Sequence, residues 1–126
     1  MSTILIVEDN EKNMKLVRDI LQHQGHTTLE AVTGADGVRI ALAQRPDLVL
    51  MDIQLPDIDG IAALRQIRAE PALDAVPVLA VSASVMPDEQ QKVVTSGFDA
   101  FITKPINLKQ FRDTVQHFLA HGRKPP

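Results

Sequence analysis

Five short apolar runs divide this chain, and each is followed by polar or turn-forming residues. The runs cover residues 3–7, 27–31, 47–52, 76–81 and 100–103. Apolar runs of four to eight residues bounded by turn residues predict buried β-strands. Runs that are apolar throughout, such as TILIV and DLVLMD, are typical of a parallel sheet that is covered on both faces. The more polar run at 27–31 favours a strand at the edge of the sheet.

Between these runs, apolar residues recur at helical spacing and predict five helices. The expected inward faces are Met14, Val17, Ile20 and Leu21; Val38, Ala41 and Leu42; Ile61, Leu64 and Ile67; Val93 and Val94; and Leu108, Phe111, Val115, Phe118 and Leu119. Asp9 or Asn10 is expected to cap the first helix. The fourth helix, between Pro87 and Gly97, has little to bury, so we expect it to be the least firmly docked.

Strict alternation of strand and helix predicts a doubly wound, three-layer α/β/α domain with a five-stranded parallel sheet. The expected strand order is 2-1-3-4-5, which is flavodoxin-like. One domain is predicted over residues 1–121, followed by a loose tail at 122–126. In this order the first and third strands are neighbours, and all strands end at the same edge of the sheet.

Composition narrows the class of protein. The chain has 126 residues, a hydrophobic content of 44%, a charged content of 23% and a net charge of −3. A net negative charge does not indicate the basic surface that binds nucleic acid or an anionic membrane. The absence of cysteine excludes disulfides and thiolate metal sites. There is no charged leader and no long apolar segment at the start, so we expect a cytoplasmic protein without a membrane span.

Reactive side chains follow four of the predicted strands. Glu8 and Asp9 follow the first strand and Asp52 ends the third, while Ser82 and Lys104 follow the fourth and fifth. Since parallel strands present their carboxyl ends at one edge, we expect these residues to gather there. Crowded carboxylates need a counter-charge, and Mg²⁺ with oxygen ligands is suitable. Asp52 is a competent nucleophile towards phosphorus, Lys104 offers a cation to a phosphoryl oxygen, and Ser82 offers a hydroxyl.

Taken singly, each of these residues has an ordinary structural explanation. Asp9 suits a helix cap, Lys104 a solvated surface position, and Ser82 the start of a turn. Asp59-Gly60 is assigned to turn chemistry only. The joint pattern of four strand ends is what favours a phosphoryl-transfer site.

The motifs ILIVEDN, LVLMDIQLPDIDG, VLAVSAS and FITKPI together make the chain similar to receiver domains of two-component response regulators. VEDNEKNMKLVRDIL and DLVLMDIQLP most resemble single-domain members that act in cell division. The resemblance covers nearly the whole chain.

The resemblance implies roles for individual residues. It implies that Asp52 is the phosphoacceptor and that Glu8, Asp9, Asp52 and the backbone carbonyl of Gln54 hold Mg²⁺. It further implies that Ser82 and Lys104 contact the phosphoryl group, and that Phe101 is a switch residue. Phe101 stands where Tyr is frequent, and from periodicity alone it is an ordinary core aromatic. The resemblance also implies a cis bond between Lys104 and Pro105.

The function implied is that of a single-domain regulator in a phosphorelay, which is not an enzyme on other substrates. Its expected partners are a histidine kinase or phosphotransfer protein and a downstream protein, bound through the face made by the fourth helix, fifth strand and fifth helix. A monomer or a weak, phosphorylation-dependent homodimer is expected.

Two other functions are considered from the residues. A haloacid-dehalogenase-type phosphatase also uses an Asp nucleophile and Mg²⁺, but it needs a second Asp where Gln54 stands. A flavodoxin-like electron carrier is disfavoured because the chain has no Trp or Tyr to stack on a flavin.

Overall fold

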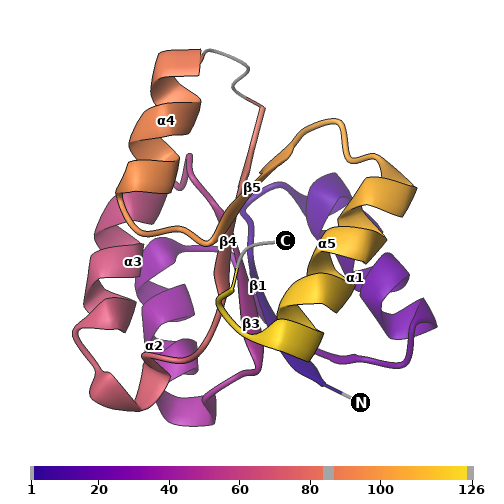
Figure 1. Ribbon diagram of the computed structural model, residues 1–126, viewed down its shortest axis with the longest axis horizontal. Coiled ribbons are helices and arrows are strands. Elements are labelled where there is room, and N and C mark those ends of the chain that lie inside the picture. Colours follow the sequence, from indigo (N-terminus) through magenta and orange to yellow (C-terminus); the bar gives the residue numbers. More distant parts are fainter. Residues whose placement is uncertain (1, 84–86, 125–126) are drawn as a thin grey trace.

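The computed structural model, which describes residues 2–83 and 87–124, contains one five-stranded parallel sheet (Figure 1). The strands are β1 (Thr3–Val7), β2 (Thr27–Ala31), β3 (Leu48–Asp52), β4 (Val78–Ser82) and β5 (Ala100–Thr103). Their order is β2-β1-β3-β4-β5, and every neighbouring pair is parallel. The predicted topology is therefore confirmed, including the edge position of the polar strand β2.

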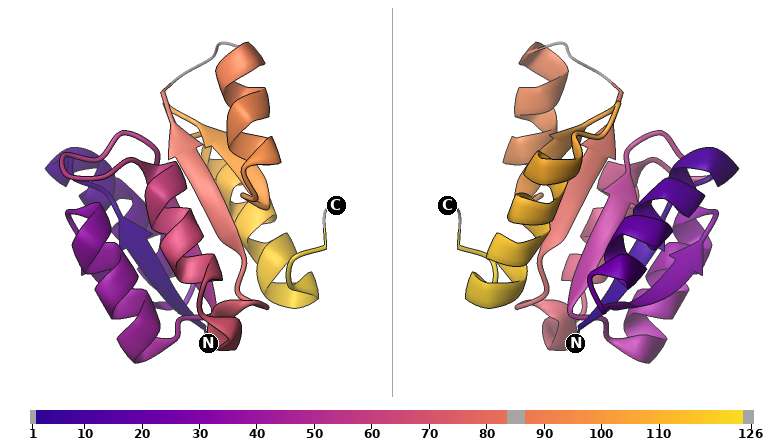
Figure 2. Two further views of the ribbon diagram at one scale, coloured as in Figure 1. Left: turned by 90° about the vertical axis from the view of Figure 1, so that its left-hand side faces the viewer. Right: turned by 90° about the vertical axis from the view of Figure 1, so that its right-hand side faces the viewer.

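Helices cover both faces of this sheet. They are α1 (Glu11–His23), α2 (Gly34–Gln44), α3 (Gly60–Arg68), α4 (Pro87–Thr95) and α5 (Leu108–His121), with a short 3-10 turn, η1 (Pro71–Leu73). Helices α1 and α5 lie on one face, and α2, α3 and α4 lie on the other (Figures 1 and 2). In the part of the chain that the structure describes, no helix combines the length and apolarity needed to cross a bilayer.

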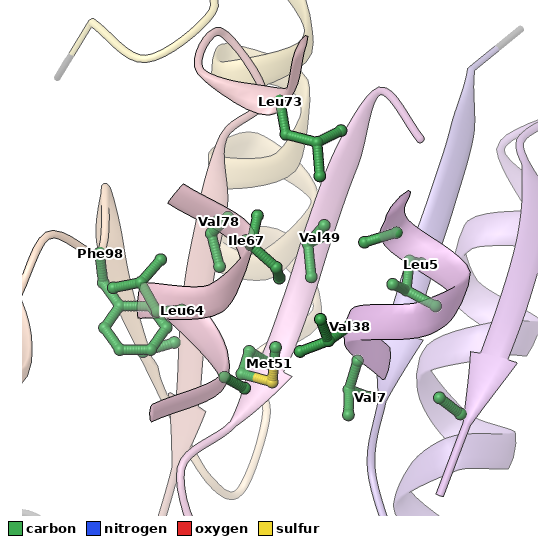
Figure 3. Packing of buried hydrophobic residues seen from close by; sticks show 14 of the residues in the cluster. Leu5, Val7, Val38, Val49, Met51, Leu64, Ile67, Leu73, Val78 and Phe98 are labelled. Carbon is green, nitrogen blue, oxygen red and sulfur yellow. The ribbon is translucent and has the colours of Figure 1, made fainter. Parts of the chain in front are cut away.

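Two apolar clusters hold the three layers together, one on each face of the sheet. On the α2–α4 side, Leu5, Val49 and Ile67 are fully buried in a cluster that also includes Leu64 and Phe98 (Figure 3). The other cluster, between the sheet and helices α1 and α5, contains Ile4, Ile6, Met14, Leu50, Leu79, Phe111, Val115 and Phe118. Successive strand residues point to opposite faces, so each central strand contributes to both clusters and its carboxyl end is firmly placed.

Polar side chains begin the helices. Asn10, rather than Asp9, caps α1, because the Asn10 side chain accepts a hydrogen bond of 3.1 Å from the Asn13 N–H. Asp59 caps α3 in the same way, accepting from the Ala62 N–H at 2.7 Å. The cap at Asn10 leaves the Asp9 carboxylate outside the helix start and available for other contacts.

Among the predicted inward residues whose side chains the structure describes, which excludes Val94, two are exposed. Leu42 in α2 is 41% exposed and Leu108 in α5 is 50% exposed. Helix α2 buries a narrow stripe of small residues, Gly34, Gly37, Val38 and Ala41, so the flanking Leu42 lies beyond the contact. Leu108 is the first residue of α5 and precedes the buried positions Phe111 and Val115.

At the amino edge of the sheet, Asp99 joins several segments. Its buried carboxylate accepts hydrogen bonds from the Val78 N–H at 2.9 Å, from Arg68 at 3.0 Å and from Arg123 at 2.9 Å. Arg123 also donates to the Asp74 carbonyl oxygen at 3.0 Å. Arg123 lies in the segment 122–126 that the sequence predicts to be a loose tail, and these bonds hold this one residue against the domain. The end of the domain at residue 121 stays a prediction.

Gly60 lets α3 start directly against the end of β3. A Cβ atom there would lie 2.8 Å from the Asp52 carbonyl oxygen and 2.9 Å from the Ile53 Cα, which are backbone atoms. The Gly60 N–H also donates to the Ile53 carbonyl at 3.0 Å. The backbone that positions Asp52 therefore depends on a residue without a side chain at position 60.

We predict that Gly60→Ala destabilises the protein by about 1–3 kcal/mol, since the added methyl group must displace backbone. Alanine would otherwise favour a helix, so the sign of the change is diagnostic. Urea unfolding measures it, with Gln66→Ala on the exposed side of α3 as a control expected to change stability by less than about 0.5 kcal/mol. Equal or greater stability of Gly60→Ala would contradict this close packing.

Candidate functional site

The carboxyl edge of the sheet brings three acidic residues together. Glu8 and Asp9 directly follow β1, and Asp52 is the last residue of β3, the strand next to β1. One carboxylate oxygen from each lies within 4.8 Å of the other two. Glu8 and Asp52 are buried, whereas Asp9 is exposed. Two buried carboxylates and one open to solvent form a cluster that a cation can reach from outside.

Lys104, the first residue after β5, reaches into this cluster. Its Nζ lies 2.7 Å from the Glu8 Oε1 and 3.2 Å from the Asp52 Oδ2. Backbone N–H groups hold the other carboxylate oxygens: Asn10 donates to Glu8 at 3.3 Å, and Gln54 donates to Asp52 at 3.0 Å. The cluster thus contains three carboxylates and one ammonium group, so one positive charge cannot balance the negative charge of three ionised acids.

The pKa values reflect this imbalance. Burial raises the pKa of Glu8 to about 7, assisted by its hydrogen bond with Asp52, and the nearby Lys104 only partly opposes the rise. Burial lowers the pKa of Lys104, but its contacts with Glu8 and Asp52 outweigh burial and raise that pKa overall. Lys104 therefore stays charged while Glu8 retains a proton near neutrality. A proton held in this way marks a place where a metal cation can supply the missing positive charge.

Ser82 and Phe101 line a hollow between the sheet and helix α4. Ser82 is the buried last residue of β4, and Phe101 is a half-buried residue of β5. Both line a hollow of about 220 Å³ together with Ile53, Gln54, Asp59, Ile61, Lys92 and Val93. Since Lys92 and Val93 belong to α4, the hollow connects the end of β4 to that helix. From the sequence we also expect the loop from Ser82 to Ser84 to move on phosphorylation, but Ser84 lies outside the described residues.

Asp57 is a positioning residue that the sequence analysis missed. Its carboxylate accepts hydrogen bonds from the Ala35 N–H at 2.9 Å and the Gly34 N–H at 2.8 Å, which lower the pKa of Asp57. The loop after Asp52 is thereby tied to the start of α2. No local signal in PDIDG reveals this contact, because the partners lie 22 and 23 residues earlier in the chain.

The structure thus brings Glu8, Asp9, Asp52 and Lys104 into one cluster, with Ser82, Gln54 and Phe101 around an adjoining hollow. The Lys104–Pro105 bond is cis, as the resemblance implied.

Comparison with known proteins identifies the family. Residues 4–116 match the model of the response regulator receiver domain, and the chain belongs to this family. It is 38% identical to the polar-differentiation response regulator DivK of Brucella anthropi over 117 residues, covering 93% of this chain and 95% of DivK. The DivK of Brucella ovis is 37% identical over the same length. The resemblance stated from the motifs is confirmed.

Solved structures agree with the fold. A receiver domain of a sensor histidine kinase from Pseudomonas aeruginosa PAO1, solved with a magnesium ion in its active site cleft, has a TM-score of 0.88 and 30% identity. The match covers 94% of this chain and 98% of that domain. A chemotaxis response regulator of Vibrio cholerae matches with a TM-score of 0.87, covering 93% of this chain and 98% of that one, at 23% identity, and shows the shared fold. The chain is therefore a receiver domain of two-component signalling.

We predict that, without divalent metal, the free energy of unfolding falls as pH rises from about 4.5 to about 7. Glu8 has a pKa of about 7 in the folded protein, against an ordinary value of 4.5. Between these two pH values the folded state binds a proton that the unfolded state has already released. The stability that this proton provides is complete below pH 4.5 and is lost as the pH rises to about 7. Glu8→Gln should flatten the slope and make the metal-free protein more stable than wild type at pH 8. Urea unfolding across pH tests this. The exposed Glu11→Gln should keep the wild-type slope, and an unchanged slope in Glu8→Gln would refute the assignment.

Proposed function

We propose that this protein is a response regulator that accepts a phosphoryl group on Asp52 from a histidine kinase or phosphotransfer protein, in a Mg²⁺-dependent reaction, and then presents an altered protein-binding surface. The observation that supports this best is the buried Asp52 carboxylate at the end of β3, 3.2 Å from the Lys104 ammonium and clustered with two further acids. The family membership supports the same function.

The chemistry requires a nucleophile, charge neutralisation and little else. An oxygen of the Asp52 carboxylate attacks the donor phosphorus, and the phosphorus–nitrogen bond of a phosphohistidine breaks. The electron pair goes to the departing nitrogen, and a ring protonated on its other nitrogen leaves as neutral imidazole. The Lys104 ammonium, already in contact with Asp52, neutralises charge on the phosphoryl oxygens. Ser82, at the end of the adjacent strand, offers a hydroxyl to another oxygen.

Magnesium fits the residues at this edge. The donor set is oxygen only, which suits a hard cation. Burial, and then the contact with Asp52, raise the pKa of Glu8, so a cation at this edge would favour the ionised carboxylate. Asp9, Asp52 and the backbone carbonyl of Gln54 would hold the ion, with Glu8 acting through water. When bound, Mg²⁺ supplies positive charge that balances the carboxylates and the incoming phosphoryl oxygens.

The output is assigned to the surface formed by α4, β5 and α5. Ser82 and Phe101 line the same hollow as Val93 of α4, so a pull on Ser82 has a short route to that helix. Of the α4 side chains that the structure describes, Val93 is the one buried in the core. A helix held by so few buried contacts is readily redistributed by modest free energy. A downstream protein, or weakly a second copy of this chain, is the proposed partner.

This function requires no other activity. The chain would catalyse only its own phosphorylation and dephosphorylation, without binding nucleic acid or membrane directly. We place it in the cytoplasm, where it would meet the phosphorylated histidine of its donor.

We predict that acetyl phosphate with Mg²⁺ labels the protein on Asp52 alone, and that Asp52→Asn abolishes the label because an amide is a poor nucleophile. Intact-mass measurement and peptide mapping of the acyl phosphate test this. The control Asp36→Asn, whose carboxylate is half exposed on α2, should be labelled like wild type. Undiminished labelling of Asp52→Asn would remove Asp52 as the phosphoacceptor.

Asp9→Ala should weaken Mg²⁺ binding by at least about tenfold, since one of the few carboxylates available to the ion is lost. The same change should leave the metal-free protein equally or more stable because it relieves repulsion. Mg²⁺ titrations followed by amide NMR measure the affinity, with the exposed Glu11→Ala as a matched acidic control. Equal Mg²⁺ affinity in Asp9→Ala and wild type would exclude Asp9 as a ligand.

Beryllofluoride, which mimics the phosphoryl group, should shift the amide resonances of Val93 and Phe101 as well as those beside Asp52. In Ser82→Ala, Asp52 should still bind the mimic, while the shifts at Val93 and Phe101 should largely disappear. Phe101→Leu serves as a second variant that should retain the shift at Ser82. Shifts confined to the surroundings of Asp52 in wild type would show that the output surface lies elsewhere.

A further inference from the structure

Two histidines stack on the last turns of α5, far along the chain from the acidic cluster. His117 and His121 are one helical turn apart, and their ring centroids lie 4.7 Å from each other with the planes tilted by 37°. His117 is half-buried, with its ring edge-to-face against Phe118 at 5.1 Å, and His121 is exposed. Residues four apart share one face of a helix, and this spacing of two histidines is a known metal-binding arrangement.

The separation of the rings suits chelation of one ion. A metal sits about 2.0–2.1 Å from each imidazole nitrogen, and therefore about 3.2 Å from each ring centre. Two centroids 4.7 Å apart then subtend an angle of about 95° at the metal, which lies between the octahedral and tetrahedral values. The separation of the two ring centres is therefore compatible with a shared ion.

The orientation of His117 is already fixed by a backbone carbonyl. Its Nε2 lies 2.9 Å from the Lys124 carbonyl oxygen. A carbonyl oxygen only accepts, so in the neutral ring Nε2 carries the proton and Nδ1 keeps a free lone pair. Histidine ligands typically donate their second ring N–H to such an acceptor, which fixes the tautomer. Lys124 therefore supplies to His117 the outer contact that metal-bound histidines commonly have.

The local charge tolerates a cation. His121 ends α5, and the C-terminal end of a helix favours positive charge. The neighbouring Arg123 is engaged by Asp99 at 2.9 Å and lies 3.9 Å from the Asp74 carboxylate. His121 and Asp74 line the same open hollow of about 570 Å³. Asp74 and Asp99 thus lie in the same hollow as His121, together with the cationic Arg123 and Lys124.

We propose that Nδ1 of His117 and the imidazole of His121 chelate one divalent transition-metal ion of the Zn²⁺, Ni²⁺ and Cu²⁺ class, with water completing the coordination. Imidazole suits these ions, whereas Mg²⁺ prefers oxygen ligands. The site is separate from the acidic cluster, because the hollow that His121 lines also contains Asp74 and Asp99 at the amino edge of the sheet. It does not depend on the proposed phosphorylation of Asp52.

Ni²⁺ titration of the full chain tests the site, with excess Mg²⁺ present to occupy the carboxylates. Calorimetry should show one Ni²⁺ per chain, and imidazole ¹⁵N spectra with diamagnetic Zn²⁺ should place the metal on His117 Nδ1 and on His121. His117→Gln and His121→Gln should each weaken Ni²⁺ binding by more than about tenfold, since a lone imidazole loses the chelate's effective concentration. The exposed His23→Gln on α1 is the matched control and should bind like wild type.

Several outcomes would overturn the proposal. Wild-type Ni²⁺ affinity in His121→Gln would do so, as would Zn²⁺-induced shifts confined to His23 and His26. Suppression of all binding by Mg²⁺ would assign the ions to the carboxylates instead. The nitrogen spectra of the wild-type protein decide the ligands even if a variant unfolds, and thermal unfolding of each variant without metal checks its fold.

Discussion

Excess negative charge at one edge of the sheet is the constraint on which the rest of this structure depends. Glu8, Asp9 and Asp52 converge there, and the two buried acids, Glu8 and Asp52, are in contact with the Lys104 ammonium group. Carboxylates taken out of water and placed side by side disfavour one another's ionisation. The fold holds them there because β1 and β3 are fully packed neighbours whose ends cannot separate. The raised pKa of Glu8 reflects the free-energy cost of ionising a carboxyl group that is buried and in contact with Asp52.

The cost of burying these carboxylates links the stability of the fold to its proposed function. An interior designed only for stability would place apolar residues at positions 8 and 52, where burial is nearly complete. The chain departs from that pattern at the strand ends and is consistent elsewhere, as proteins commonly are at functional sites. A bound cation would relieve the repulsion between the carboxylates, so in the proposed function the same feature that weakens the metal-free fold would create affinity for the ion. The neighbouring backbone supports this arrangement through Gly60 and through the bonds from Asp57 to the start of α2.

Much of this could be predicted from sequence because it follows from local patterns and general topology. The runs TILIV and DLVLMD predict buried parallel strands, and the strand order places their ends together. Prediction failed where long-range geometry decides. Leu42 fits a helical stripe, yet it is exposed because α2 meets its neighbours along small residues. The contacts of Asp57 with α2, and of Arg123 with Asp99, join segments that no motif pairs. The sequence likewise does not show that Ser82, Phe101 and helix α4 line the same hollow, because they come from separate elements.

The bonds of Arg123, which follows α5, have a practical consequence. Arg123 is bound to Asp99 and to the Asp74 carbonyl at the amino edge of the sheet, while Asp52 lies at the carboxyl edge. A dye, affinity handle or reporter module joined beyond Lys124 would therefore leave the molecule on the side away from the acidic cluster. Such an attachment would allow the proposed docking of a phosphoryl donor at Asp52 to be followed without interference from the attached group.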